Sequence, residues 1–409
     1  MSNNSLRHWM VFTSACLLMV AASVNTALSF FVEPVTLDLG YTRSGFTMYV
    51  SVMTFVQIFS MPILGNIFAK FGPKKLIMIG GTICTIGLIL LGYSTTLLSF
   101  YIAGAIIGLM LPAATILGAV FLINNWFKTK KGLFMGIAMS ASGIGGALLG
   151  VIMPILITNI GWRNGYLFLA GAFFILTVLL SLVLVKDSPG SSGLLAYGDV
   201  KKTINESNLE GIVEEGTEFS KAIKSKEFYM IYIGFIMLAI LVSFYQHIPA
   251  FFTERGLSSV SGGALMSVYM LSMIAAKIIA GVFHDKLGSK ATVILCYGLF
   301  LGAFIFLSNS NGYLLLVIGM ILFSFGTGSI SVLPPLMTNL VFGEKDYSKI
   351  YGIIGTAGAV GMTIGTPIWG YVYDTTESYN IGLYGGYILV PLVIVLLLQV
   401  VRTTKKTSN

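Results

Sequence analysis

The chain has 409 residues and a formal net charge of +8, yet 56% of its residues are hydrophobic and only 10% are charged. Soluble domains carry about 25% charged residues, so this composition excludes an ordinary soluble protein. Uncharged stretches such as 76–126 and 133–160 exceed the roughly 20 residues with which an α-helix crosses a bilayer. The sequence therefore predicts a polytopic helical membrane protein.

Hydropathy along the chain predicts twelve membrane spans. In chain order they are 9–32, 45–67, 76–93, 98–122, 133–157, 165–185, 228–251, 261–283, 291–308, 313–336, 351–373 and 383–401. The first apolar run is longer than the hydrophobic region of a signal peptide, so we expect it to be a span and not a cleaved leader.

One long polar stretch, 186–227, separates six spans from six. Its Gly, Ser and mixed charges suit a cytoplasmic linker, with a short amphipathic helix around 218–227. The predicted organisation is an N-terminal six-helix bundle at 1–185, this linker, and a C-terminal six-helix bundle at 228–409.

Two short basic loops repeat at a constant distance. Gly65, Lys70, Gly72 and Lys74 recur 216 positions later as Gly281, Lys286, Gly288 and Lys290, and the same offset relates Gly136 and Gly145 to Gly352 and Gly361. An offset that persists across separate elements indicates a duplicated unit. The predicted fold is an all-α membrane protein of twelve transmembrane helices in two pseudo-symmetric six-helix bundles.

The fifth and eleventh spans are rich in Gly, Ala, Ser and Thr. Small residues let helix backbones approach closely, and in a transporter they can leave room for two bundles to rock about a central site. Static close packing is the alternative. The duplication favours rocking.

The placement of the positive charges predicts the topology. Fourteen Lys and Arg residues fall in alternate loops and at the termini, and six more lie in 186–227, whereas the opposite loops hold only Arg43, Arg163 and Arg255. By the positive-inside rule, the basic loops, both termini and the linker are cytoplasmic. The excess charge is therefore explained by topology and gives no support for a nucleic-acid partner.

Enzyme and cofactor chemistry find no support in the sequence. Cys16, Cys84 and Cys296 lie in apolar runs and show neither metal-ligand spacing nor a disulfide framework. No Walker A loop is present, so ATP is not expected to drive the protein. We expect no enzyme activity, no cofactor and no metal.

The twelve spans, the central linker and the loop 281–290, which follows a Gly-x-x-x-Asp-Lys-x-Gly-x-Lys pattern, resemble the major facilitator superfamily. The segment "NNWFKTKKGLFMGIAMSASGIGGALLG" (124–150), followed by "GWR", resembles its oxalate/formate antiporter and monocarboxylate porter branch. The segments 31–44, 247–258 and 334–355 extend this likeness. The resemblance covers nearly all of the chain except the linker, and it implies a secondary transporter of the cell membrane that acts as a monomer.

The same resemblance implies a gating role for the repeated loops, with Gly65, Gly72, Gly281, Asp285 and Gly288 as the residues of the motif. In this superfamily the Asp of the first-half loop helps to hold the cytoplasmic side closed. Ala69 takes that position here, which we expect to weaken the outward-facing state. Alternatively, the loss is neutral because another residue compensates for it.

Lys277 is the one Lys or Arg inside a predicted span, and that span contains no Asp or Glu. A lysine near the bilayer centre costs about 2.5–3.5 kcal/mol on insertion scales, so such residues usually face a cavity or a partner. A transported anion would be a natural counter-charge. Alternatively, the side chain snorkels to the cytoplasmic interface.

The resemblance implies a role for Lys277, because oxalate/formate-type transporters carry a substrate-binding Arg at its position, four residues before Gly281. Those transporters have a second cation where this chain has Gly358. One cation suits a monocarboxylate better than oxalate.

His247 is the one histidine inside a predicted span. Because an imidazole ordinarily titrates near pH 6.5, His247 is a candidate proton carrier. The segment "HIPAFF" also resembles the place where monocarboxylate/proton symporters carry a coupling histidine. An interfacial histidine without this role is the alternative.

Polar residues without charge complete the candidate substrate site: Gln57 and Asn25, Ser331 with Thr327 on the tenth span, and, as weaker candidates, Tyr351 and Tyr245. Gln57 lies at the position of a glutamine that lines the site of the oxalate relatives. Hydrogen bonds between helices are the competing explanation. Asp38, in the first outer loop, is expected to be solvated.

Together these features predict a secondary active transporter of a small organic anion, with a monocarboxylate favoured, that works by alternating access. Lys277 would bind the carboxylate at the interface of the halves, and proton symport or anion exchange would drive transport. One alternative is an efflux pump for drugs or other solutes. A non-transporting sensor is a second, although the linker 186–227 is too short for a separate signalling domain. The expected partners are the anion, a proton or counter-anion, and the lipid bilayer.

Overall fold

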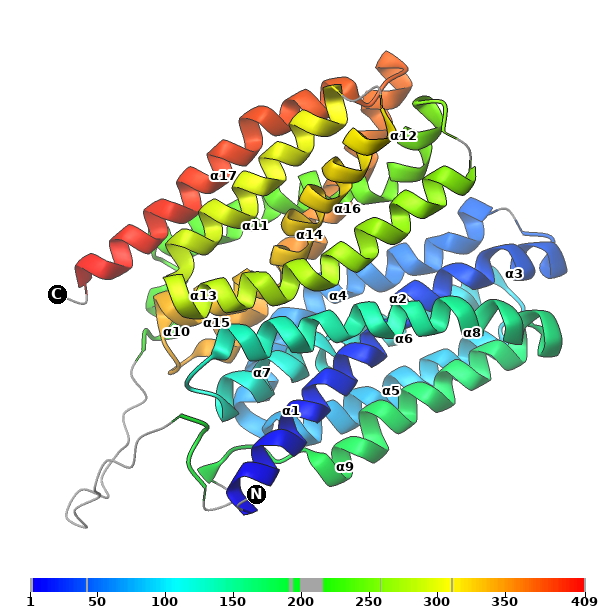
Figure 1. Ribbon diagram of the computed structural model, residues 1–409. Helices are drawn as coiled ribbons and strands as arrows, with labels where there is room; N and C mark the ends of the chain where they lie inside the picture. The colour runs from blue at the N-terminus through cyan, green and yellow to red at the C-terminus, as the bar shows by residue number, and fades with distance from the viewer. Residues whose placement is uncertain are drawn as a thin grey trace, which may run out of the picture. The chain divides into compact units, whose positions relative to one another are not determined.

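The computed structural model describes residues 3–41, 43–190, 194–198, 216–257, 259–309 and 312–407, in which all named elements are helices (Figure 1). The chain divides into two compact units. One consists of Met1–Phe134 and Ala138–Val213, and the other of Met135–Ile137 and Glu214–Asn409.

The first unit contains the helices coloured from blue to green in Figure 1. They are α1 (Asn3–Ala22), α2 (Val24–Ala27), the 3₁₀-helix η1 (Leu28–Phe31), α3 (Val32–Leu39), α4 (Arg43–Phe71), α5 (Pro73–Tyr93), α6 (Leu97–Ala114), α7 (Ile116–Trp126), α8 (Lys131–Phe174), the π-helix η2 (Ile175–Leu179) and α9 (Leu180–Leu184).

The second unit continues from green to red. Its helices are α10 (Phe219–Ala222), α11 (Lys226–Val242), the 3₁₀-helix η4 (Ser243–Gln246), α12 (Ile248–Glu254), α13 (Ser259–Asn309), α14 (Tyr313–Phe342), α15 (Tyr347–Ile354), α16 (Thr356–Thr376) and α17 (Asn380–Thr407). The short helix predicted around 218–227 is only the single turn α10, because α11 already begins at Lys226.

The helices account for the twelve predicted spans. In the described part of the chain, nine helical segments are long and apolar enough to cross a membrane. Two of them hold a pair of spans each, since α8 reverses at Gly161 and α13 reverses at Gly288. The eleventh span corresponds to α15 and α16, which follow each other with only Gly355 between them.

The duplication extends to the backbone conformation of the turns. Three pairs of residues 216 positions apart share a positive φ: Gly40 (68°) and Gly256 (74°), Gly72 (76°) and Gly288 (77°), and Gly161 (79°) and Glu377 (53°). Such a conformation is readily adopted only by glycine. The halves therefore turn at equivalent places even where the residue differs, as it does at Glu377.

Glycines allow helices to pack closely inside each bundle. A Cβ atom on Gly145 of α8 would lie 2.7 Å from the carbonyl oxygen of Val20 in α1. A Cβ atom on its equivalent in the second half, Gly361 of α16, would lie closer still to the carbonyl oxygen of Ile236 in α11. For these two glycines the structure shows the close packing that small residues permit, which is the static alternative to rocking.

The two ends of the linker dock on equivalent loops. The backbone N–H of Tyr197 donates to the carbonyl of Trp126 at 2.8 Å, and the backbone N–H of Thr217 donates to the carbonyl of Phe342 at 2.7 Å. Trp126 and Phe342 are 216 positions apart and end α7 and α14. We call these contacts the first and second linker clips.

Charged groups and a glycine reinforce the second linker clip. Lys345 Nζ lies 3.0 Å from Glu218 Oε1, and the carboxylate of Asp346 accepts a hydrogen bond of 2.9 Å from the backbone N–H of Phe219. A Cβ atom on Gly216 would lie 2.8 Å from both the Phe342 carbonyl oxygen and the Lys345 backbone nitrogen. The clip therefore has no room for a side chain at position 216.

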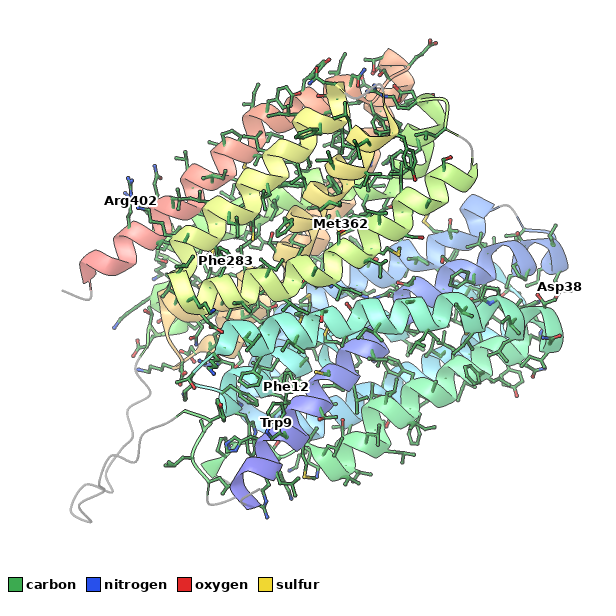
Figure 2. The ribbon with its side chains drawn as sticks, viewed as in Figure 1. Trp9, Phe12, Asp38, Phe283, Met362 and Arg402 are labelled. Carbon is green, nitrogen blue, oxygen red and sulfur yellow. The ribbon has the colours of Figure 1, made fainter. Side chains whose placement is uncertain are left out.

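A carboxylate joins the end of α3 to the reversal of α8. Asp38, labelled in Figure 2, accepts hydrogen bonds from Trp162 Nε1 at 3.0 Å and from Arg163 Nη1 at 3.1 Å. Asp38 is exposed, as the sequence predicted, and the fold also brings it to these two donors far along the chain. These hydrogen bonds, from Trp162 and Arg163 in that order, hold the pKa of the Asp38 carboxyl below its ordinary value.

The second half has the equivalent contact. Glu254, 216 positions after Asp38, ends α12 and accepts a hydrogen bond of 2.7 Å from the Ser378 hydroxyl and one of 3.3 Å from the Tyr379 backbone N–H. Each half thus uses one carboxylate to tie the end of its first span to the turn between its fifth and sixth spans.

Substituting Gly216→Ala should open the second linker clip. The added methyl group overpacks the backbone of 342–345 at a cost of about 1–3 kcal/mol, which corresponds to a roughly five- to hundred-fold increase in local opening. Cleavage by trypsin after the exposed Lys221 should accelerate accordingly. Gly190→Ala is the control, because a Cβ atom there meets no atom within 4 Å; equal cleavage rates in the two variants would contradict the clip.

Asp38→Asn should lower the melting temperature at neutral pH and have a diminishing effect in acid. Because its pKa is lowered in the folded protein, the carboxyl contributes stability above its unfolded-state pKa and loses it as the pH falls through the folded-state pKa. Thermal melting of both proteins from pH 7 to the most acidic tolerated pH measures this. A difference between wild type and variant that stays constant down to the lowest pH would show that the charge of Asp38 does not matter.

Candidate functional site

Lys277 lies in the first membrane-crossing part of α13, and its side chain is buried, with 6% of the residue exposed. A lysine that snorkels to an interface keeps its charged end in water, which such burial does not allow. A Cβ atom on Gly328 of α14 would lie 3.3 Å from the backbone nitrogen of Lys277 and 3.4 Å from its Cγ atom. The backbone of α14 therefore packs directly on the lysine and fixes the base of its side chain.

Hydroxyl groups lie along the same contact of α13 and α14. The phenol of Tyr269, on α13, forms a hydrogen bond with the hydroxyl of Thr327, which directly precedes Gly328. Ser331 lies almost one turn further along α14 and is half-buried, and its hydroxyl donates to the carbonyl of Gly328 at 2.9 Å. The structure thus brings Ser331 and Thr327 to the part of α14 that packs against Lys277.

Tyr351 lies in α15 and is buried. Its ring stacks on that of Tyr347, with the centroids 5.7 Å apart and the planes within 6° of parallel, and the Tyr347 phenol donates to the carbonyl of Pro335 at 3.2 Å. Stacking of this kind contributes to the core of the second unit, so Tyr351 has a packing role whether or not it also meets substrate.

Two of the predicted substrate residues belong to the first unit. Gln57 lies half-buried in α4, and Asn25 lies exposed in α2. Within the described part of the chain, neither side-chain amide forms a hydrogen bond. An amide can both donate and accept, so both side chains have hydrogen-bonding capacity left for a ligand.

His247 is held through both ring nitrogens at the junction of η4 and α12. Nε2 lies 3.0 Å from the carbonyl oxygen of Thr366, and Nδ1 lies 3.2 Å from the Tyr379 hydroxyl. A carbonyl can only accept, so Nε2 carries a proton, and in the neutral ring Nδ1 accepts from the phenol. On protonation Nδ1 can donate to the phenol oxygen instead, so the ring can gain a proton and keep both partners.

The repeated loops adopt the same turn in both halves. Gly72 begins α5 and Gly288 lies at the reversal of α13, while Gly65 and Gly281 lie inside the preceding helical segments α4 and α13. Asp285, in the second loop, lies 3.9 Å from His284 Nδ1.

A carboxylate is also present at the first loop, although Ala69 cannot supply it. Asp187, directly after the sixth span, accepts a hydrogen bond of 2.9 Å from the backbone N–H of Lys74, and its Oδ1 atom would lie 2.7 Å from a Cβ atom on Gly72. An acidic group at a helix N-terminus is stabilising. Asp187 supports the alternative that the missing acid at Ala69 is compensated elsewhere.

A groove of about 450 Å³ opens in the first unit between the residues that follow α2 and the middle of α8. Its lining includes Phe30, Val32, Pro34, Pro154 and Ile157. Among the side chains that the structure describes, the lining contains no charged residue and none of the predicted substrate residues, so we do not assign the anion to this groove.

Comparison with known proteins places the chain in a family. A model described as "Major Facilitator Superfamily" matches residues 13–366, and a second match covers 253–409. The chain belongs to the major facilitator superfamily. It is accordingly an integral membrane transporter and not an enzyme, as the sequence predicted.

Curated relatives in the superfamily include several monocarboxylate transporters. Monocarboxylate transporter 12 of Rattus norvegicus is 26% identical over 398 residues, which cover 91% of this chain and 81% of the relative. Monocarboxylate transporter 2 of Mesocricetus auratus is 25% identical over 344 residues, covering 81% and 70% of the two chains. The predicted resemblance to this branch of the superfamily is confirmed.

Solved structures of superfamily members share the fold. The transporter FucP, in the outward conformation, matches with a TM-score of 0.73 at 11% identity, covering 96% of this chain and 99% of FucP. The human organic anion transporter MFSD10 matches with a TM-score of 0.70 at 15% identity, covering 97% and 100%. Together with the family match, this confirms the predicted twelve-helix architecture.

Sequence analysis missed three polar residues at these sites: Asp187, Glu254 and Tyr379. Their partners lie more than 100 residues away along the chain. The offset of 216 could have paired Glu254 with Asp38 as two acids at equivalent loop positions. No feature of the sequence indicates what Asp187 or Tyr379 contacts.

Gly328→Ala should disturb the setting of Lys277. The new methyl group would lie 3.2–3.4 Å from the Cβ of Ala276 and from two atoms of Lys277, and overpacking of this kind costs about 1–3 kcal/mol. We expect a lower melting temperature and slower anion uptake than in Gly298→Ala, where a Cβ atom on the second membrane-crossing part of α13 meets nothing within 4 Å. Identical behaviour of the two variants would show that α14 does not fix Lys277.

Proposed function

We propose that this member of the major facilitator superfamily is a secondary active transporter of a small organic anion, specifically a monocarboxylate, and that Lys277 binds the carboxylate. The observation that carries the proposal is the burial of Lys277 in a membrane-crossing helix. An ammonium group there is costly unless polar or charged groups meet it. A substrate carboxylate would supply a charge-assisted hydrogen bond.

Two further observations support this substrate class. The curated relatives include monocarboxylate transporters 12 and 2. Gly358 takes the place at which the resemblance to oxalate transporters implies a second cation. A single buried cation suits one carboxylate, and the uncharged remainder of the substrate would meet the hydroxyl and amide groups of Ser331, Gln57 and Asn25.

In the proposed cycle, the carboxylate accepts hydrogen bonds from the Lys277 ammonium group and from the amides of Gln57 and Asn25. A carboxylate that pairs with the ammonium group would lower the cost of keeping that charge away from water when the binding site closes. Closure is then favourable mainly for the loaded carrier, which couples substrate binding to alternating access. The repeated loops that contain Gly72 and Gly288 would act at the cytoplasmic gate.

The coupling ion is part of the proposal. His247 can gain a proton at Nδ1 while it keeps Thr366 and Tyr379 as partners, which supports proton symport. Exchange of one anion for another also fits a single-cation site. Export of drugs or other solutes is the rival function, and it would be favoured if binding did not depend on Lys277.

The Lys and Arg distribution supports a cell-membrane protein with both termini in the cytoplasm. We propose bundle boundaries at 1–185 and 228–409 with the linker at 186–227 between them. We also propose that the monomer is the transporting form and that its partners are the anion and a proton or counter-anion.

Carboxylate binding should raise the melting temperature of the wild type and not that of Lys277→Ala. A ligand at 100 times its dissociation constant adds about 2.7 kcal/mol, so a panel of mono- and dicarboxylates screened on purified protein should reveal the substrate. Lys224→Ala, which removes an exposed lysine, should respond as the wild type does. An anion that stabilises Lys277→Ala as much as the wild type, or a panel without any stabilising anion, would favour the rival function.

His247→Gln should slow uptake driven by a pH gradient much more than exchange of substrate for substrate across proteoliposomes at uniform pH. A proton carrier is needed for net symport, whereas exchange returns the carrier in its loaded form. Exchange measured beside gradient-driven uptake therefore serves as the internal control. If both rates fall equally, His247 is a structural residue between Thr366 and Tyr379.

A further inference from the structure

Tyr379 occupies the turn between α16 and α17, and only 3% of the residue is exposed. Its phenol oxygen lies 3.2 Å from His247 Nδ1. The phenol therefore meets the ring nitrogen that changes from acceptor to donor when the imidazole gains a proton.

The ring of Tyr379 is fixed by aromatic neighbours. It stacks on Tyr373 of α16, with the ring centroids 4.7 Å apart and the planes 28° from parallel. Phe244 and Phe251 meet it edge to face, with centroid distances of 5.6 and 6.4 Å. A phenol held in this way offers His247 a hydrogen bond of defined direction.

Two charged residues that are neighbours in sequence, Glu254 and Arg255, hold the turn at residues 378–380. Glu254 accepts hydrogen bonds from the Ser378 hydroxyl and the Tyr379 backbone N–H. Arg255 donates to Asn380 Oδ1 at 2.6 Å and to the backbone carbonyls of 307 and 308 at the end of α13. Glu254 and Arg255 therefore both anchor residues 378–380 through hydrogen bonds.

The first half contains an equivalent carboxylate contact but has no imidazole at the position of His247. The residue 216 positions before His247 is Phe31, whose ring stacks on Tyr166 with a centroid distance of 3.7 Å. Asp38 stands in the place of Glu254, and Arg163 stands in the place of Tyr379. The carboxylate contact thus belongs to the duplicated fold, whereas the imidazole and the phenol are found together in the second half alone.

We infer that Tyr379 is a positioning residue for His247, held in place by Glu254, and that it sets the pH at which His247 takes up a proton. This inference rests on the proposed coupling role of His247. In the neutral state the phenol donates to Nδ1. When a proton adds to Nδ1, the N–H donates to the phenol oxygen, and the phenol keeps its own hydrogen for another acceptor.

The hydrogen bond between the phenol and the imidazole predicts the direction of the effect. Hydrogen bonds to charged groups are stronger than those between neutral groups, so the phenol favours the imidazolium over the neutral ring. Glu254 acts through Tyr379, because it accepts a hydrogen bond from the backbone N–H of that residue and so holds the phenol in place. Removing the phenol or neutralising Glu254 should therefore make protonation of His247 harder.

The test is an NMR titration of the full-length protein in lipid nanodiscs. The chain has three histidines, so His8→Gln and His284→Gln leave His247 as the one imidazole observed with ¹³Cε1-labelled histidine. In this background we expect Tyr379→Phe to shift the titration midpoint by about 0.5–1 pH unit towards acid. Glu254→Gln should shift it in the same direction.

Two matched controls isolate the contact with His247. Tyr373→Phe removes the phenol of the ring stacked on Tyr379, and Asp38→Asn neutralises the equivalent acid of the first half; both should leave the midpoint unchanged. A midpoint in Tyr379→Phe equal to that in Tyr373→Phe would overturn the inference while leaving the coupling role of His247 intact. If His247 does not titrate between pH 5 and 8.5 in the background protein, the coupling role and this inference both fail.

Discussion

An ammonium group buried in a membrane-crossing helix is the constraint on which the account of function depends. Hydrocarbon tolerates backbone only as helix or closed barrel, and it tolerates charge only where polar groups meet it. The twelve helices satisfy the first condition. Lys277, packed under the backbone of Gly328, imposes the second, and a carboxylate that arrives and leaves is the group proposed to meet it.

Comparing the two halves of the duplicated fold distinguishes structural features from candidate functional residues. Features that recur at the offset of 216 are structural: the positive-φ turns at Gly72 and Gly288, the linker clips, and the carboxylates Asp38 and Glu254. The candidate functional groups stand where the halves differ. Met61 takes the position equivalent to Lys277, just as Phe31 takes that of His247. The two halves share one scaffold, but the candidate charged and titratable groups, Lys277 and His247, lie in the second half.

The sequence predicted those properties that local composition determines. The spans could be predicted because an apolar run is a property of residues near one another. The duplication could be predicted because the constant offset of 216 is a repeated pattern. The contacts of Asp187 with Lys74 and of Tyr379 with His247 join residues 113 and 132 positions apart. No periodicity connects such pairs, and their meeting depends on how the helices pack. The two donors to Asp38 could not be predicted for the same reason. The candidate role of Lys277 could be proposed because a charge inside a span is visible without any knowledge of packing.

The most direct measurement of carboxylate recognition compares acids with their amides. Each amide has nearly the shape of its acid but carries no charge, and both can be added as competitors of labelled monocarboxylate uptake in proteoliposomes. The account predicts that the acid competes and that its amide does not, because only the acid can pair with the Lys277 ammonium group. An amide that competes as well as its acid would show that shape and not charge is recognised, and would contradict the assignment of Lys277.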